Sequence, residues 1–274
     1  MIRQAQLFLF ALQFLTRLPA PRLDPGPDWV ARAAPYYPAV GWLVGAIAAA
    51  ALFGVAQLWP GLPAAVIALA VGFAVTGGFH EDGLADTADG LGGGQTPARR
   101  LEIMKDSRTG TFGALALWTG LTLKAALLAP LAPTKAALCL LAAHGAARAF
   151  PVVVMATLRY AGDAEAAKLK PVGIGVRPHE ALIALALGLA PLPFLQPLPQ
   201  AALGVGLATV GAMALALLAR RLIGGYTGDV LGAVEQIAEM ALLLGFTIGP
   251  AIGSWATVRA PLWPVFILQT AAPP

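Results

Sequence analysis

Long apolar runs separated by polar connections dominate the pattern of this chain. Seven of the runs are close to the roughly 20 residues that a helix needs to cross the hydrocarbon core of a bilayer. They are residues 39–58, 62–79, 112–131, 136–158, 181–198, 201–219 and 240–258, and a shorter apolar tail covers residues 262–268. The pattern therefore predicts an all-α fold, a polytopic integral membrane bundle of about seven transmembrane helices.

The composition agrees with this prediction. Hydrophobic residues make up 58% of the 274-residue chain and charged residues only 12%, which is far from the balance of a soluble domain. We expect one membrane-embedded domain over residues 1–274, in contact with membrane lipid. The net charge of +4 does not indicate a nucleic-acid partner, because the basic residues are scattered among loops. The single cysteine, Cys139, excludes an internal disulfide, and the sequence leaves the oligomeric state open.

The distribution of basic residues predicts the orientation, because cytoplasmic loops are enriched in Lys and Arg. Alternating spans place only Lys135 and Arg259 on one side, whereas the other side receives the basic residues of the N-terminus and of the connections near residues 99–108, 159–177 and 220–221. We therefore expect a multi-pass protein of the cell inner membrane with its N-terminus in the cytoplasm. The same alternation puts all 14 Asp and Glu residues on the cytoplasmic face. Residues 7–15 follow Arg3 without a small-residue cleavage site, so an uncleaved interfacial helix is expected.

A first acidic constellation follows the second apolar run. Asp82, Asp86 and Asp89 are spaced i, i+4 and i+7, so on a helix their carboxylates share one face. Such a face repels itself unless a cation neutralises it, and oxygen ligands suit Mg²⁺ held together with a substrate phosphate. The bland alternative is a solvated acidic loop, which does not explain the small Ala, Thr and Gly spacers. The sequence therefore favours a Mg²⁺ site.

Residues 99–113 form the next polar segment. Lys105 and Arg108 offer cations to phosphate oxygens, and Asp106 adds a carboxylate between them. Taken alone, the segment is equally typical of a basic amphipathic stretch lying on lipid headgroups. Its proximity to the three aspartates favours the functional interpretation.

A second constellation lies near residues 224–239, where glycines open a carboxylate-bearing helix. Asp229 is expected at the helix start, where helix capping and a role in the site explain its presence equally well. Glu235 and Glu239 share a face just before the last apolar run. His144 and Arg148 are placed i and i+4 inside the fourth run, and ionisable groups at that depth face a protein interior or a pathway. An interhelical hydrogen bond is an equal alternative for His144.

At these positions the sequence resembles the cobalamin synthase family, the adenosylcobinamide-GDP ribazoletransferases. The resemblance runs along nearly the whole chain. It rests on residues 11–19 (ALQFLTRLP), 36–38 (YYP), 77–94, 101–113 (LEIMKDSRTGTFG) and 224–239. The segments DGLADTADG and KDSRTGTFG are its most specific parts, and neither departs from the family pattern. Residues 161–178 are less characteristic, and no role is carried over to them.

The resemblance implies a Mg²⁺-dependent phosphotransferase of cobalamin biosynthesis with one catalytic domain. The ribose 3′-hydroxyl of α-ribazole, or of its 5′-phosphate, would displace GMP from adenosylcobinamide-GDP. Under this hypothesis Asp82, Asp86 and Asp89 hold Mg²⁺ against the pyrophosphate, and Asp106 is a further ligand or the base. Lys105 and Arg108 would steady the departing GMP phosphate. Asp229, Glu235 and Glu239 would complete a binding site, the two glutamates for a second metal or the ribazole sugar.

Two other classes compete with this interpretation. A CDP-alcohol phosphotransferase also places spaced aspartates at a membrane surface, and its pattern is DGxxAR. This chain has Asp82-Gly83-Leu84-Ala85-Asp86 and therefore lacks the arginine of that pattern. A cation transporter would carry its charges near the bilayer midplane, where the apolar runs contain only Lys124, His144 and Arg148.

Overall fold

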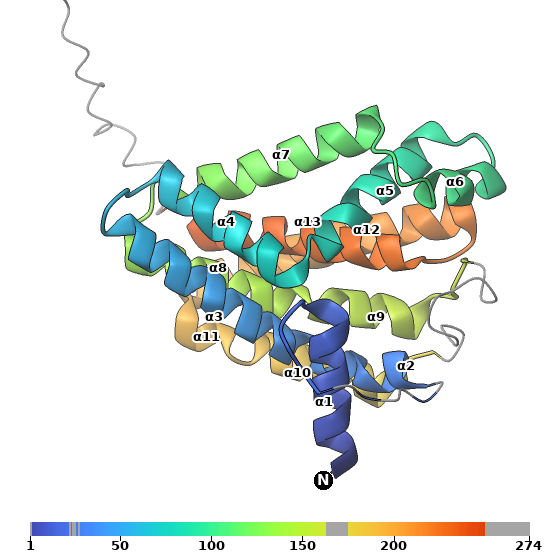
Figure 1. The fold of residues 1–274 in the computed structure, drawn as a ribbon, viewed down its shortest axis with the longest axis horizontal. Coiled ribbons are helices and arrows are strands. Elements are labelled where there is room, and N and C mark those ends of the chain that lie inside the picture. Colours follow the sequence, from blue (N-terminus) through green and yellow to red (C-terminus); the bar gives the residue numbers. More distant parts are fainter. Residues whose placement is uncertain (1, 22, 24–25, 27, 163–174, 250–274) are drawn as a thin grey trace, which may run out of the picture.

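The structure is a computed structural model that describes residues 2–249 except 22, 24–25, 27 and 163–174. Its described part is built mainly from helices (Figure 1). In chain order they are α1 (Ile2–Leu15), α2 (Trp29–Ala33), the 3-10 helix η1 (Ala34–Tyr36), α3 (Tyr37–Ala56), α4 (Leu62–Thr76), α5 (Phe79–Gly93), α6 (Pro97–Met104), α7 (Thr111–Leu128), α8 (Pro133–Ala147), α9 (Ala149–Thr157), α10 (Pro178–Leu189), α11 (Leu192–Leu195), α12 (Leu198–Ile223) and α13 (Gly228–Thr247).

The prediction of an all-α membrane bundle is confirmed. Among the described residues, 6 helical stretches are long and apolar enough to cross a membrane: Trp29–Ala56, Thr111–Leu128, Pro133–Thr157, Pro178–Leu195, Leu198–Ile223 and Gly228–Thr247. Counting α4 and α5 as one broken span gives 7. Large apolar side chains such as Trp118, Phe194 and Val210 point outward from these helices, exposed by 67%, 89% and 62%. In a bilayer they would face lipid.

The last span differs from its prediction. The apolar run began at residue 240, whereas α13 begins at Gly228 and ends at Thr247. The Thr227 side chain caps the helix by accepting the Val230 N–H at 3.2 Å. The first turns of α13 are polar, so hydropathy alone does not detect the part of the helix that precedes residue 240. Residues 250–258 and the predicted tail at 262–268 lie outside the described residues. Glu235 and Glu239 are therefore inside the span, and the prediction that all acidic residues gather on one face is wrong for these two.

Helix α13 is the centre of the bundle. It packs along α12 and also contacts α5, α7, α8 and α9 (Figure 1). The buried side of α12 is a stripe of small residues, Ala201, Gly204, Ala208, Ala212, Ala216 and Ala219. Small side chains let two helix backbones approach closely, which replaces the hydrophobic driving force that is missing in lipid.

A sharp bend separates α4 from α5. Gly77 and Gly78 both have left-handed backbone angles, with φ of 73° and 70°, which glycine adopts without the steric penalty of a side chain. The two helices consequently meet at 92°. With its four acidic residues and only 15 residues in all, α5 is too short and too polar to span a bilayer alone. Within this broken pair we therefore treat α4 as the part inside the membrane and α5 as the part outside it.

The two ends of the bundle differ in their connections. The α3–α4, α7–α8 and α11–α12 connections lie at one end, on the left of Figure 1, and α5, α6 and the α12–α13 turn lie at the other. The predicted acidic segments therefore do meet at one end of the molecule, which we call the acidic end. The N-terminal apolar run forms α1, which packs against α2 and α3.

Candidate active site

The acidic end is organised by the contact between α5 and α13. A Cβ atom on Gly83 would lie 2.8 Å from the Asp229 carbonyl oxygen and 3.1 Å from the Gly232 Cα, so only glycine permits this approach of the two backbones. The contact brings Asp229 of α13 beside the acidic helix α5. Asp82 is exposed there, and Asp86 and Asp229 are half-buried.

Burial and the neighbouring carboxylates change the ionisation of Asp86. Burial, followed by the charges of Asp82, Asp229 and Asp89, raises the pKa of Asp86 from 3.8 to about 7. Like charges close together disfavour ionisation in this way. Among the described residues, no Lys, Arg or His nitrogen lies within 4.0 Å of the carboxylates of Asp82, Asp86 or Asp229. Within the described part of the chain, the acidic face therefore carries negative charge that no basic side chain neutralises by a direct ion pair.

Asp89 has a different environment from the other two aspartates of α5. It is buried, and its two carboxylate oxygens accept the backbone N–H groups of Gly110 at 2.7 Å and Gly113 at 2.8 Å. These groups belong to the start of α7, where helix N–H groups lack intrahelical partners. Asp89 thus ties α5 to the N-terminus of α7.

Asp106 and Arg108 contact each other in the turn before α7. The Arg108 guanidinium donates its Nε–H at 3.0 Å and an Nη2–H at 2.6 Å to the two oxygens of Asp106. These hydrogen bonds lower the pKa of Asp106 to about 2. An acid this strong is a poor proton acceptor at neutral pH, so the geometry disfavours the predicted role of Asp106 as a base while the pair is intact. Lys105 is exposed beside them.

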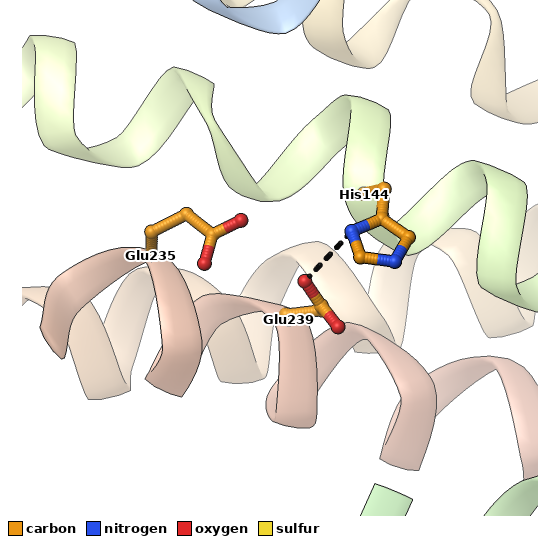
Figure 2. Close-up of side chains that lie close together, drawn as sticks. All are labelled: His144, Glu235 and Glu239. Carbon is orange, nitrogen blue, oxygen red and sulfur yellow. Dashed lines mark ion pairs between the residues drawn. The ribbon is translucent and has the colours of Figure 1, made fainter. Parts of the chain in front are cut away.

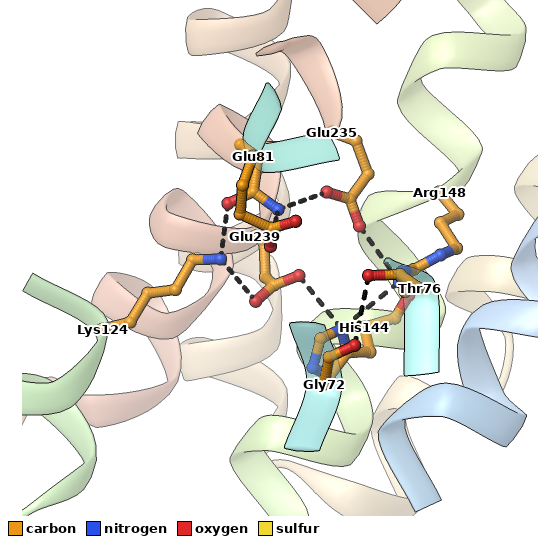
Figure 3. Close-up of polar contacts among 9 residues, drawn as sticks. Gly72, Thr76, Glu81, Lys124, His144, Arg148, Glu235 and Glu239 are labelled. Carbon is orange, nitrogen blue, oxygen red and sulfur yellow. Dashed lines mark hydrogen bonds and ion pairs between the residues drawn. The ribbon is translucent and has the colours of Figure 1, made fainter. Parts of the chain in front are cut away.

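Glu235 and Glu239 belong to a polar cluster inside the bundle (Figure 3). Both glutamate side chains are completely buried. Glu239 pairs with Lys124 of α7 at 2.9 Å and with His144 of α8 at 3.1 Å. Glu235 pairs with Arg148 at 3.0 Å. Each buried carboxylate thus has its own cation, unlike the aspartates at the acidic end.

Gln236 extends this cluster to α5. Its side-chain oxygen accepts a hydrogen bond from Lys124 at 2.7 Å, and its amide nitrogen donates to Glu235 at 2.9 Å and to Glu81 at 3.1 Å. Sequence reasoning missed Glu81 and Gln236. Glu81 directly precedes Asp82, and Gln236 directly follows Glu235. Neither residue belongs to a spacing pattern of its own, so the sequence did not single it out.

One group of residues brings three possible metal ligands together within the described part of the chain. Ligand atoms of His144, Glu235 and Glu239 lie within 4.8 Å of one another (Figure 2). Lys124 and Arg148 already compensate these carboxylates, which removes the electrostatic need for a metal. The side chains of Asp82, Asp86 and Asp89 do not form such a group, so as placed they do not all reach one common ion.

Comparison with known proteins identifies the family. The model of the family described as cobalamin-5-phosphate synthase matches residues 7–247. The chain belongs to this family. The resemblance predicted from the DGLADTADG and KDSRTGTFG motifs is thereby confirmed, as is the assignment to an enzyme family with cobalamin synthase activity.

The similarity to individual relatives extends over most of both chains. The chain is 45% identical over 259 residues to an adenosylcobinamide-GDP ribazoletransferase of Leptothrix cholodnii, covering 91% of this chain and 97% of that protein. It is 44% identical over 246 residues to a protein of the same name from Shewanella baltica, covering 87% and 92%, and 41% identical over 247 residues to one from Shewanella halifaxensis, covering 88% and 95%. No solved structure matches the chain.

Proposed function

We propose that this member of the cobalamin-5-phosphate synthase family transfers adenosylcobinamide phosphate from adenosylcobinamide-GDP to α-ribazole or its 5′-phosphate, at the acidic end of the bundle and with Mg²⁺. In the reaction the ribazole hydroxyl oxygen bonds to the phosphorus that carries the corrinoid. The bond from that phosphorus to the bridging oxygen breaks, GMP leaves with the bridging oxygen, and the hydroxyl proton passes to a base or to solvent.

One observation supports this proposal: Asp82 and Asp229 lie near enough to Asp86 to raise its pKa, and no Lys, Arg or His of the described residues pairs with these three carboxylates. A donor set made only of carboxylate oxygens fits Mg²⁺, which is typically bound by one or two carboxylates together with substrate phosphates. Mg²⁺ would supply charge neutralisation to the pyrophosphate. Asp82 and Asp86, one helical turn apart on α5, are the residues we assign to hold it, with Asp229 facing them from α13.

The remaining residues of the acidic end have supporting roles. Asp89 fixes α5 against α7 through the Gly110 and Gly113 N–H groups while adding to the negative field on Asp86. Arg108, oriented by Asp106, and the exposed Lys105 are placed in the same segment to bind phosphate oxygens of the departing GMP. Phosphoryl transfer depends mainly on such positioning and charge neutralisation.

We assign Glu235 and Glu239 to positioning rather than to a second metal or the ribazole sugar. Their complete burial and their pairs with Arg148 and Lys124 support this assignment. Through Gln236 the cluster also reaches Glu81, the neighbour of Asp82. It therefore sets the rotation of α5, and with it the direction of the acidic face.

The location is inferred from the same geometry. We place the acidic end in the cytoplasm and the bundle in the inner membrane, because the connections at that end hold most of the basic residues. Nucleotide-activated substrates are cytoplasmic compounds, which agrees with this orientation.

The test is an assay of purified protein in nanodiscs with adenosylcobinamide-GDP and α-ribazole. We expect product only with added Mg²⁺, and a loss of at least about a hundredfold in kcat for Asp86→Asn, the size of effect seen when one preorganised electrostatic group is removed. Glu102→Gln is the matched control, because Glu102 is an exposed carboxylate paired with Arg99 on α6. Full turnover by Asp86→Asn, or turnover in a metal chelator, would refute the proposal.

A further inference from the structure

A cavity lined largely by aromatic rings adjoins the acidic end, and no role has been assigned to it above. Its volume is about 130 Å³. It lies between α1, α2, α3, α5, α9 and the start of α13, and aromatic rings form much of its wall: Phe14, Tyr37, Phe79, Tyr160 and Tyr226. A cavity of roughly 150 Å³ with apolar walls holds benzene, so this slightly smaller one, which is open on one side, takes one edge of a flat ring system while the rest of the ring extends out of it.

The rings of the wall pack on one another in two groups. Phe14 stacks on Tyr37 with ring centroids 6.0 Å apart and meets Phe79 edge-on at 5.4 Å. Tyr160 and Tyr226 meet at 5.6 Å and 70°. Aromatic rings prefer offset or edge-to-face neighbours, and a flat ligand between the two groups would find both kinds of contact.

Two polar groups in the wall have no hydrogen-bond partner among the described residues. His80 is buried with 5% exposure, and none of the hydrogen bonds among the described residues involves its ring. The buried Nε of Arg148 likewise lacks a hydrogen-bond partner, although its NH1 pairs with Glu235. A mostly apolar pocket with one or two placed donors is typical of a small-molecule site, because the donors fix the orientation of the ligand.

The cavity lies next to the acidic face along both α5 and α13. Phe79, Asp82 and Asp86 are spaced i, i+3 and i+7 on α5, so they lie on the same side of that helix. On α13, the wall residues Gly228 and Gly232 flank Asp229. A ligand whose ring fills the cavity would therefore place a substituent on that ring beside the carboxylates.

We infer that this aromatic cavity binds the base of the nucleoside substrate, a flat and largely apolar bicyclic ring with one hydrogen-bond-accepting nitrogen. The inference rests on the proposed function, because that function supplies an α-ribazole whose base has this chemistry. His80 or Arg148 donates a hydrogen bond to the ring nitrogen. The cavity is too small for the sugar, which stays outside with its hydroxyl directed to the acidic face.

The experiment measures binding of α-ribazole separately from catalysis, by equilibrium dialysis against the protein in nanodiscs with a metal chelator present. Met155→Trp and Val30→Trp fill the cavity from two different walls. Leu207→Trp is the control, because Leu207 lies on the outer surface of α12. We expect each filling variant to weaken binding by at least about tenfold, the order of discrimination given by pocket fit, and the control to bind like the wild type.

Two further readouts keep the result decisive. Free benzimidazole should compete with α-ribazole in the wild type, whereas ribose should not, and a photoreactive benzimidazole should crosslink to residues of the cavity wall. Asp86→Asn should still bind α-ribazole even though it does not turn over, which separates this inference from the proposed metal site. Unchanged binding in both filling variants, crosslinks elsewhere, or a retained phospholipid that blocks the cavity and that α-ribazole does not displace would overturn the inference.

Discussion

Lys124 and Glu239 form an ion pair in the interior of the bundle, with Nζ and Oε1 2.9 Å apart and exposures of 1% and 0%. The pair joins α7 to α13, and His144 contacts the other oxygen of Glu239 from α8. Removing two charges from water costs more than their attraction returns unless further hydrogen bonds complete the site. Gln236 provides one of these bonds to Lys124. The pair and its histidine therefore position two helices, α7 and α8, against the central helix α13.

Breaking this pair is expected to destabilise the fold. Lys124→Met leaves a buried carboxylate without its main cation and should lower the free energy of unfolding by about 3–5 kcal/mol. The double variant Lys124→Met/Glu239→Gln should lose less than the sum of the two single variants, because it leaves neither charge alone. Unfolding in mixed detergent measures these differences. Lys135→Met, at an exposed lysine of α8, is the control, and strictly additive effects would contradict the pairing.

Asp89 should be needed for stability more than its neighbours are. In Asp89→Asn the amide nitrogen cannot accept the N–H of Gly110 or Gly113, so a helix start loses part of its cap, at a cost of about 1–2 kcal/mol. Asp82→Asn should not lower stability, because Asp82 is exposed and removing its charge relieves repulsion with Asp86. Thermal melting of the two variants checks this. Equal melting temperatures for both would show that Asp89 does not cap α7.

The acidic face predicts a specific dependence of stability on pH. The pKa of Asp86 is raised from 3.8 to about 7 in the folded protein, so between these values the folded state binds more protons than the unfolded state, and its stability falls as pH rises. Melting temperatures in a metal chelator should therefore decline from about pH 4 to about pH 7 more steeply in the wild type than in Asp86→Asn.

Mg²⁺ supplies the control for this pH experiment. A divalent cation at the acidic face would offset the repulsion, so added Mg²⁺ should flatten the decline in the wild type. It should have little effect on Asp86→Asn. Identical pH profiles for the two proteins in the chelator would show that Asp86 is not held close to other carboxylates.

The sequence revealed the spans and the acidic helix α5 because both depend on local pattern. The spacing of Asp82, Asp86 and Asp89 predicted a helix correctly, but spacing along one helix does not show what faces it. The α7 N-terminus binds Asp89 through Gly110, 21 residues away along the chain, and the α13 backbone contacts Gly83 through Asp229, 146 residues away. Hydropathy also placed Glu235 and Glu239 before a span, because buried ion pairs make a helix look polar.

The orientation can be tested in cells by labelling single cysteines. Cys139 is completely buried, so it should not react. A Gln95→Cys variant at the acidic end should be protected from a membrane-impermeant reagent in intact cells, and Thr134→Cys at the opposite end should be labelled. Both positions are exposed. The reverse pattern would place the acidic end outside the cytoplasm.

The most direct test of the metal site is a change of metal preference at Asp86. A thiolate is a soft ligand that binds Mg²⁺ poorly and Cd²⁺ or Mn²⁺ better. We expect Asp86→Cys to lose activity with Mg²⁺ by at least about a hundredfold and to recover part of it with Cd²⁺ or Mn²⁺, while Glu102→Cys keeps the preference of the wild type. Full Mg²⁺-dependent activity in Asp86→Cys would contradict the account, because Asp86 would then not contact the metal.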